Sequence, residues 1–234
     1  MAASGALFLG LVVALASVGG ARSQPVQVSR AVVSVAPEER LAPAAAHRPG
    51  SELTVSPAWV TRVAAAAGIP EPAVRAYGAA TLSENRDDPG CHLGWTTLAG
   101  IGWVESQHGT IDGRVLDTDG HSTPPVLGPP LDGQHDTAAI RSEDGTWERA
   151  VGPLQFLPST WDRWAADGDG DGVADPQDLD DAALAAGRYL CEAGGDLAAG
   201  SGWVTAVRAY NHADTYVRAV YDAASTYATR TGAD

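Results

Sequence analysis

Regularly spaced aspartates form the clearest chemical pattern in this 234-residue chain. Segment 167–178 reads DGDGDGVADPQD, with carboxylates at positions 1, 3, 5, 9 and 12 and glycine at position 6. This is the spacing of an EF-hand loop, whose hard oxygen ligands suit Ca²⁺. The predicted ligands are Asp167, Asp169, Asp171, the carbonyl of Val173, Asp175 and Asp178. The short Asp at position 12 indicates modest affinity and a structural ion, and the alternative is a solvated acidic turn.

Glu105 is the candidate for acid–base chemistry. It lies in segment 102–109, GWVESQHG, near the end of an apolar stretch rich in aromatic residues. A carboxyl group flanked by Trp103 and Val104 is partly desolvated, which disfavours its ionised form and prepares it to donate a proton near neutral pH. Taken alone, a glutamate at a helix end is also compatible with a solvated or capping role.

Two further segments complete a pattern with Glu105 and the acidic loop. Segment 152–161 reads GPLQFLPSTW, and segment 209–211 reads AYN. The chain therefore carries, in order, Glu-Ser with a following Gly, Gly-x-x-Gln-Phe-x-Pro-Ser-Thr, an Asp-rich loop and Ala-Tyr-Asn. This order resembles the lytic murein transglycosylase B family in its actinobacterial form, over about residues 95–221. Each motif is weak alone, but four in this order make the resemblance specific.

The resemblance implies an all-α, lysozyme-like helical domain that cleaves the β-1,4 bond between N-acetylmuramic acid and N-acetylglucosamine in peptidoglycan. Glu105 matches the single catalytic acid of the family. In the implied mechanism it protonates the glycosidic oxygen and then, as a carboxylate, removes the proton from the muramic C6 hydroxyl, which closes a 1,6-anhydro ring. Because the attacking hydroxyl belongs to the substrate, neither an activated water nor a second carboxylate is needed.

The same matching assigns a set of polar and aromatic residues to substrate binding. These residues are Ser106, Gln155, Phe156, Tyr210 and Asn211. Hydroxyl and amide groups can orient the hydroxyl and acetamido groups of sugars. The alternatives are loop capping for Gln155 and Asn211, and core packing for Tyr210 and Phe156. His108 and His212 stand near the motifs, and we assign them no metal role.

The N-terminal part of the chain predicts export. Residues 6–17 are apolar but too few for a comfortable membrane span, and small residues follow them, so we interpret 1–21 as a signal peptide, with an uncleaved anchor as the alternative. Residues 22–52 lack periodicity and form a linker, which leaves 53–234 as the enzymatic domain. An oxidising compartment predicts a disulfide between Cys91 and Cys191, the alternative being two buried free thiols.

Periodicity and capping signals predict helices separated by one long irregular loop. The predicted helices cover 57–67, 71–82, 92–106, 158–166, 179–193, 203–210 and 215–229. Residues 109–149 are dense in Gly, Pro, Asp and Thr, and we expect an active-site loop there that contains at most a hairpin. One of the acidic residues in this loop is a candidate for a second carboxylate near the reaction centre.

Charge and length restrict the partners. A formal net charge of −14 argues against nucleic acid and anionic membrane surfaces. We therefore expect a monomer that acts on peptidoglycan strands outside the cytoplasm, without membrane insertion unless the N-terminal segment is retained. Two other functions remain open: a hydrolytic muramidase on the same scaffold, and a non-catalytic, calcium-dependent wall-binding module.

Overall fold

The structure, a computed structural model, describes residues 55–134, 139–142 and 144–232. The predicted signal peptide and linker lie outside these residues. The described helices are α2 (Pro57–Ala67), α3 (Glu71–Asp87), α4 (Trp95–Ser106), α5 (Pro158–Trp164), α6 (Leu179–Gly194), α7 (Gly200–Tyr210) and α8 (Asp214–Thr231). The two-residue strands β1 (Val115–Leu116) and β2 (Ser122–Thr123) pair antiparallel. The predicted all-α class is confirmed, and the hairpin falls inside the predicted irregular segment.

Local capping explains where the helices begin and end. The side chain of Ser56 accepts a hydrogen bond from the Trp59 N–H at the start of α2, and Gly68 ends this helix with φ of 74°. Both bounds agree with the prediction. Helix α4 starts at Trp95 rather than at the predicted residue 92, because His92 has φ of 53° and the Leu93 N–H binds the Asn85 side chain instead of entering a helical ladder.

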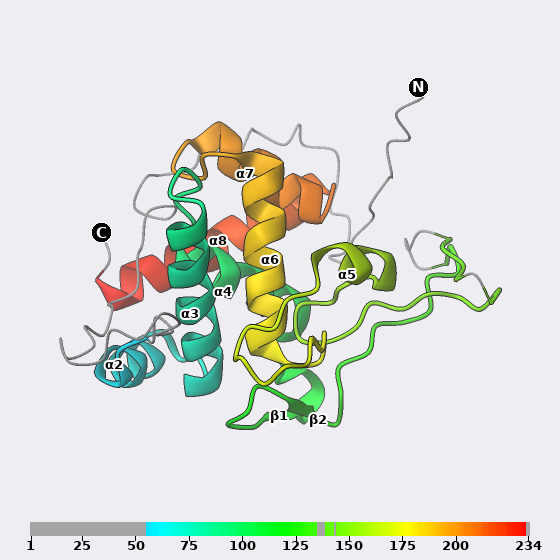
Figure 1. Ribbon diagram of the computed structural model, residues 1–234, viewed down its shortest axis with the longest axis horizontal. Helices are drawn as coiled ribbons and strands as arrows, with labels where there is room; N and C mark the ends of the chain where they lie inside the picture. The colour runs from blue at the N-terminus through cyan, green and yellow to red at the C-terminus, as the bar shows by residue number, and fades with distance from the viewer. Residues whose placement is uncertain (1–54, 135–138, 143, 233–234) are drawn as a thin grey trace.

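Helices α4 and α8 pack along each other, and α3 and α7 both pack against α6 (Figure 1). A disulfide joins Cys91, just before α4, to Cys191 in the last turns of α6, with the two Cα atoms 5.3 Å apart. The predicted pairing is therefore confirmed. It ties the start of α4 to the far end of α6, which brings together segments separated by 100 residues.

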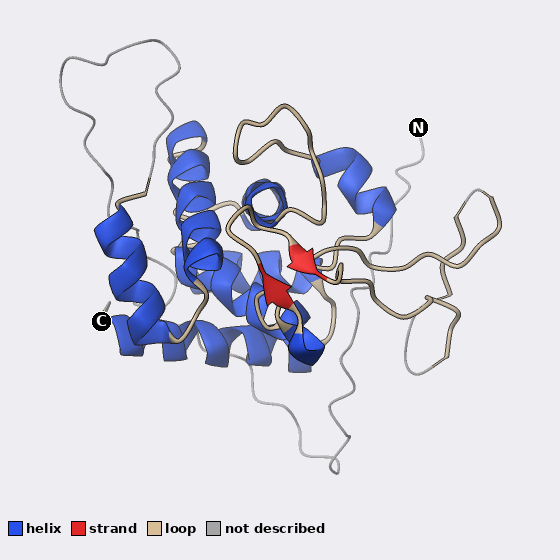
Figure 2. Ribbon diagram, turned by 90° about the horizontal axis from the view of Figure 1, so that it is seen from below, coloured by secondary structure: helices blue, strands red, loops and turns tan. Residues whose placement is uncertain are grey.

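The long segment between α4 and α5 is irregular, as predicted, but it contains an ordered arm. Backbone hydrogen bonds join Gly128 to Ala150 and Leu131 to Glu148, each at 2.8 Å. A small apolar cluster of Leu131, Ala150, Leu157 and Ile140 packs where the arm meets the body. Figures 1 and 2 show the arm extending away from the helices. It returns to the body at the turn that precedes α5.

Among the described residues, no helix combines the length and apolar character that crossing a bilayer requires. The apolar residues 6–17 are not among them.

Candidate active site

Glu105 lies in the last turn of α4 and is only 5% exposed. The hydroxyl of Tyr216, near the start of α8, donates a hydrogen bond of 2.6 Å to its Oε1, whereas Oε2 accepts none from the described residues. Burial raises the pKa of Glu105 to about 8, although the Tyr216 hydrogen bond opposes this shift. The carboxyl group is therefore mostly protonated at neutral pH and can donate a proton.

A second tyrosine, Tyr210, lies near this carboxyl group and packs against Phe156. Tyr210, the last residue of α7, donates its hydroxyl to the carbonyl of Leu154 at 2.8 Å, and its ring packs edge-on against Phe156. Burial, and then the charge of Glu105, raise the pKa of Tyr210 well above its usual value, which is the sign that the two groups lie close together. Tyr210 is buried, so its ring helps to exclude water from Glu105.

The turn between residues 152 and 156 is docked on the end of α4. Ser106 donates its hydroxyl to the carbonyl of Pro153 at 2.5 Å and accepts the N–H of Gly109 at 2.7 Å. Gly152 has φ of 79°, and a Cβ atom there would clash with the carbonyl of Pro176. Gln155 lies at φ of 52° and donates its amide to the Gly152 carbonyl at 2.9 Å. The hydrogen bond from Ser106 therefore holds this turn, with its Gln-Phe pair, against the end of α4.

The structure places the predicted site residues at the end of α4, in the turn at 152–156 and at the end of α7, and it gives several of them internal partners. Ser106 and Gln155 are buried and hydrogen-bonded to backbone, and the Asn211 side chain accepts the Ala213 N–H at 3.1 Å in the connection between α7 and α8. Their expected contact with substrate stays a prediction. Tyr216 was not predicted, and the one available signal was a tyrosine five residues after Asn211, in the first turn of the next helix.

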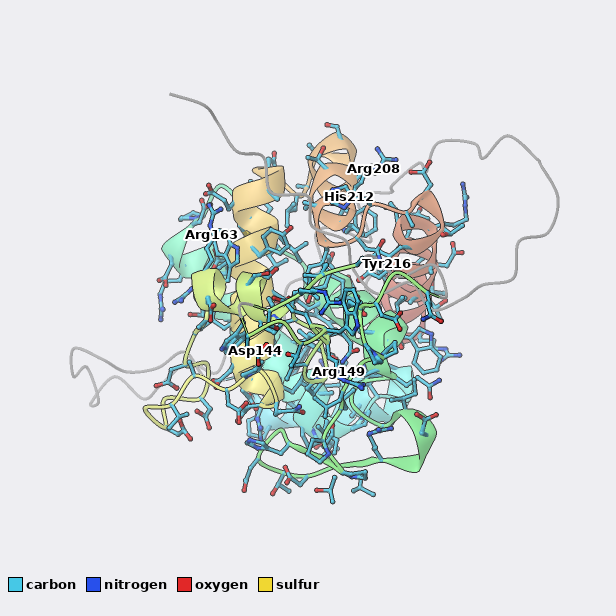
Figure 3. All side chains as sticks on the ribbon, turned by 90° about the vertical axis from the view of Figure 1, so that its right-hand side faces the viewer. Asp144, Arg149, Arg163, Arg208, His212 and Tyr216 are labelled. Atoms are coloured by element: carbon cyan, nitrogen blue, oxygen red, sulfur yellow. A yellow bond between two sulfur atoms is a disulfide. The ribbon has the colours of Figure 1, made fainter. Side chains whose placement is uncertain are left out.

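Figure 3 looks at the side of the molecule that carries Tyr216. Arg149 of the arm and His212 of the connection between α7 and α8 lie on this same side. Arg149 donates a hydrogen bond to the carbonyl of Gly128 at 2.8 Å, which holds it to the opposite strand of the arm. The arm and the two C-terminal helices therefore contribute side chains to one side of the molecule.

The acidic loop gathers carboxylates as a cation site requires. Ligand atoms of Asp167, Asp169 and Asp181 lie within 4.8 Å of one another. Burial raises the pKa of Asp181, backbone N–H groups oppose the shift, and the charges of Asp169 and Asp167 add to it. Three hard oxygen donors that repel one another in this way fit a divalent cation such as Ca²⁺. Gly172 adopts φ of 92°, as expected for position 6 of the loop.

The remaining predicted ligands lie in the same loop, where their carboxylates, like those of Asp167, Asp169 and Asp181, accept backbone N–H groups. The side chains of Asp171 and Asp175 accept the N–H groups of Val173 and Gln177, and Val173 is exposed. Asp178 caps α6 by accepting the N–H of Asp180 at 2.8 Å. Asp181, in the first turn of α6, was not singled out from the sequence because the EF-hand template ends at position 12.

Comparison with known proteins supports the relationship expected from the motifs. The family model described as "Transglycosylase SLT domain" matches residues 133–215. This range includes the turn at 152–156, the acidic loop and Tyr210, and it begins after Glu105. No curated protein matches.

Two solved structures of the Escherichia coli lytic transglycosylase Slt35 are similar to this chain. One is a complex with bulgecin A, at a TM-score of 0.44, and the other a complex with calcium, at a TM-score of 0.45. Each is 15% identical, over 75% of this chain and 76% of the other. At these values the likeness carries no conclusion about the present chain. The family match does not distinguish type B, but it confirms the predicted relationship to lytic transglycosylases over residues 133–215, which match the model of the transglycosylase SLT domain.

Proposed function

We propose that this protein is an exported peptidoglycan lytic transglycosylase that cleaves the β-1,4 bond between N-acetylmuramic acid and N-acetylglucosamine, with Glu105 as its single acid and base. The observation that carries this proposal is the state of Glu105. It is buried, its pKa is about 8, one oxygen is held by Tyr216, and the other accepts no hydrogen bond from the described residues. A carboxyl group of this kind is suited to give a proton to a substrate oxygen.

The same geometry suits both steps of the reaction. Protonated Glu105 transfers its proton to the glycosidic oxygen as the bond from this oxygen to the muramic C1 breaks. The resulting carboxylate is stabilised by the hydrogen bond from Tyr216. It then accepts the proton of the muramic C6 hydroxyl while O6 bonds to C1, which regenerates the acid and closes the 1,6-anhydro ring. Burial favours the neutral acid and is the larger effect, while the Tyr216 hydrogen bond favours the carboxylate and so makes ionisation less costly.

A hydrolytic muramidase would need a second carboxylate to activate water. No carboxylate among the described residues contributes to the pKa of Glu105. Several described acidic side chains of segment 109–149 have other contacts, whereas Oε2 of Glu148 is buried and accepts no hydrogen bond from the described residues. Asp112 pairs with Arg114 at 3.1 Å, Asp117 and Asp132 accept backbone N–H groups, and Asp144 binds Thr146. We therefore propose the non-hydrolytic outcome.

We further propose a structural Ca²⁺ held by Asp167, Asp169 and Asp181, with Asp171, Asp175, Asp178 and the Val173 carbonyl as the other candidate ligands. The ion would supply charge neutralisation in the loop that joins α5 to α6, and no step of the reaction requires it. Export agrees with the Cys91–Cys191 disulfide, since such bonds persist in oxidising compartments. The proposed organisation is a signal peptide or anchor over 1–21, a linker over 22–52 and an enzymatic domain over 53–234.

The substitution Glu105→Gln tests the catalytic proposal. The amide keeps the shape of the side chain but has no acidic proton, so we expect muropeptide release from purified sacculi to fall by at least about 100-fold, with the fold retained. Mass spectrometry of the released material should show 1,6-anhydromuramic ends for the unaltered protein.

The matched control is Glu84→Gln. Glu84 is also buried and burial also raises its pKa, but it lies on α3 among different neighbours. This variant should keep its activity. Reducing-end products would establish the muramidase instead, and unchanged turnover in Glu105→Gln would remove Glu105 from the mechanism.

A further inference from the structure

His108, which follows the end of α4 three residues after Glu105, connects this helix to α3 and α8. It is 2% exposed, and each ring nitrogen has one phenol partner: Nδ1 lies 3.0 Å from the hydroxyl of Tyr77 on α3, and Nε2 lies 2.9 Å from the hydroxyl of Tyr227 on α8. Burial lowers the pKa of His108 to about 3, so the ring is neutral. A neutral imidazole donates through one nitrogen and accepts through the other, and therefore both hydroxyls can be satisfied.

The backbone around His108 is shaped for this bridge. Gln107, His108 and Gly109 all have positive φ, at 54°, 61° and 80°, and left-handed conformation is unfavourable for the first two. The His108 N–H closes the end of α4 by binding the carbonyl of Gly102 at 2.8 Å. The chain thus turns sharply three residues after Glu105 and places the imidazole between α3 and α8.

Two glycines of α4 make room for the same arrangement. A Cβ atom at Gly102 would clash with the hydroxyl of Tyr77, which could then not reach His108. A Cβ atom at Gly100 would lie 2.7 Å from the carbonyl of Val220, so this glycine lets the α8 backbone approach α4. Glycine is less favourable than alanine inside a helix, but at these two positions the missing side chain lets α3 and α8 approach α4 closely.

The contact with Tyr227 bears directly on Glu105. Tyr216 and Tyr227 are separated by eleven residues, or about three helical turns, and so they lie on one face of α8. Tyr216 binds Glu105, and Tyr227 binds His108. The end of α4 therefore holds α8 at two points about 16 Å apart along its axis. Two such contacts on one face restrict both the distance of α8 from α4 and its rotation.

From these contacts we infer that His108 is a positioning residue for Glu105: through Tyr227 and Tyr77 it holds α8 in the rotation that brings the Tyr216 hydroxyl onto the Glu105 carboxyl group. The inference deepens the proposed function and rests on it. His108 touches no substrate in this scheme. Its effect reaches the reaction through the length of one hydrogen bond, which is what favours the carboxylate form of Glu105.

The substitution Tyr227→Phe tests this inference, since it removes one hydroxyl and keeps the ring that packs against His108. We expect kcat on sacculi to fall by tenfold to about 100-fold with KM nearly unchanged, because a small misplacement of a catalytic group acts on the chemical step. A looser Tyr216 bond should also raise the pKa of Glu105. That pKa is read from the carboxyl ¹³C NMR signal of labelled protein, assigned by its loss in Glu105→Gln. The ionisable groups that face Glu105 are Tyr216 and Tyr210.

Thr97→Val is the matched control. It removes one buried hydrogen bond, from Trp203 Nε1 at 2.9 Å, at the opposite end of the same helix. It should lower thermal stability as Tyr227→Phe does, yet leave kcat and the pKa of Glu105 unchanged. His108→Gln, whose amide can reach toward Tyr227, should recover part of the kcat that His108→Leu loses.

Equal effects of Tyr227→Phe and Thr97→Val on kcat and on the Glu105 signal would show that the bridge is only structural and would overturn the inference. So would a Tyr227→Phe protein with unaltered kcat and an unaltered titration. If the unaltered protein releases no muropeptides, the proposed function fails by itself. The NMR titration would then still decide whether Tyr227 controls the pKa of Glu105.

Discussion

The two oxygens of the Glu105 carboxyl group differ in their surroundings, and this difference suits a group that acts first as an acid and then as a base. The sequence predicts a desolvated glutamate from the flanking Trp103 and Val104, but these neighbours do not account for its burial. Trp103 is 47% exposed, and so it does not cover Glu105. Residues next to each other in a helix point in different directions, and the hydrogen-bond partner that contacts Glu105 comes from α8, 111 residues away. Only the tertiary packing could identify Tyr216.

Burial of Glu105 predicts a pH dependence of stability. Its pKa is about 8 in the folded protein, against 4.5 for an exposed glutamate, so the folded state binds more protons between these values. Its contribution to the free energy of unfolding is therefore complete below about pH 4.5 and is lost as the pH rises through 8. Glu105→Gln lacks this titration. Relative to the unaltered protein, it should gain up to a few kcal/mol of stability between pH 5 and pH 8.5, as measured by urea unfolding.

If the free energies of unfolding of Glu105→Gln and the unaltered protein differ by a constant amount over this pH range, the raised pKa of Glu105 is contradicted. The buried His108 acts in the opposite direction and over a lower pH range. Its pKa is lowered to about 3, so its contribution is lost as the pH falls below about 6.5. Because both proteins contain His108, this second titration cancels in the comparison.

At the scale of elements, local signals determined most helix ends, and long-range contacts determined the rest. Helix α2 begins and ends as predicted, with Ser56 and Pro57 at its start and Gly68 at its end, because caps act on neighbouring backbone groups. Helix α3 continues to Asp87, five residues beyond the predicted end. Polar residues follow Leu82 and favour a helix end there, but Glu84 is buried against the body and Asn85 binds the backbone of Leu93, so tertiary contacts hold the last turns of α3.

The disulfide is the strongest link between elements that the sequence predicted. Replacing both Cys91 and Cys191 with alanine should lower the free energy of unfolding by about 2–5 kcal/mol, because the bridge closes a loop of 100 residues and restricts the unfolded chain. Denaturant unfolding of the double variant measures the loss. The backbone bond from Leu197 to Cys91 at 2.7 Å remains, and the fold should persist.

Reduction of the unaltered protein provides the control for this substitution, since it breaks the same bond without changing a side chain. The reduced protein and the double variant should have similar midpoints. If the reduced protein and the double variant both unfold at the midpoint of the oxidised protein, the disulfide contributes no stability.

At the scale of the whole molecule, the order of helices and the position of the irregular segment followed from periodicity and composition, but the assembly around Glu105 did not. The site combines the end of α4, the turn at 152–156, the end of α7 and the start of α8. Their proximity depends on close approaches such as that of α8 to Gly100, and no local pattern reports such a contact. The acidic loop shows the same limit. A template of twelve residues ends at Asp178, whereas the fold brings Asp181 from the following helix to Asp167 and Asp169.

The position of Asp181 beside Asp167 and Asp169 predicts which aspartates bind the proposed calcium ion. For the unaltered protein, Ca²⁺ at about 100 times its Kd should add roughly 2.7 kcal/mol to the free energy of unfolding, measured as a rise in Tm that a chelator reverses. Asp169→Ala and Asp181→Asn should lose most of this rise, because each removes a charge from the cluster within 4.8 Å. Asp178→Asn should keep most of it, since asparagine caps a helix about as well as aspartate and the cap on α6 is retained. Loss of the rise in Asp178→Asn, with Asp181→Asn unaffected, would instead place the twelfth-position aspartate on the ion. A Tm that ignores calcium in the unaltered protein would remove the site altogether.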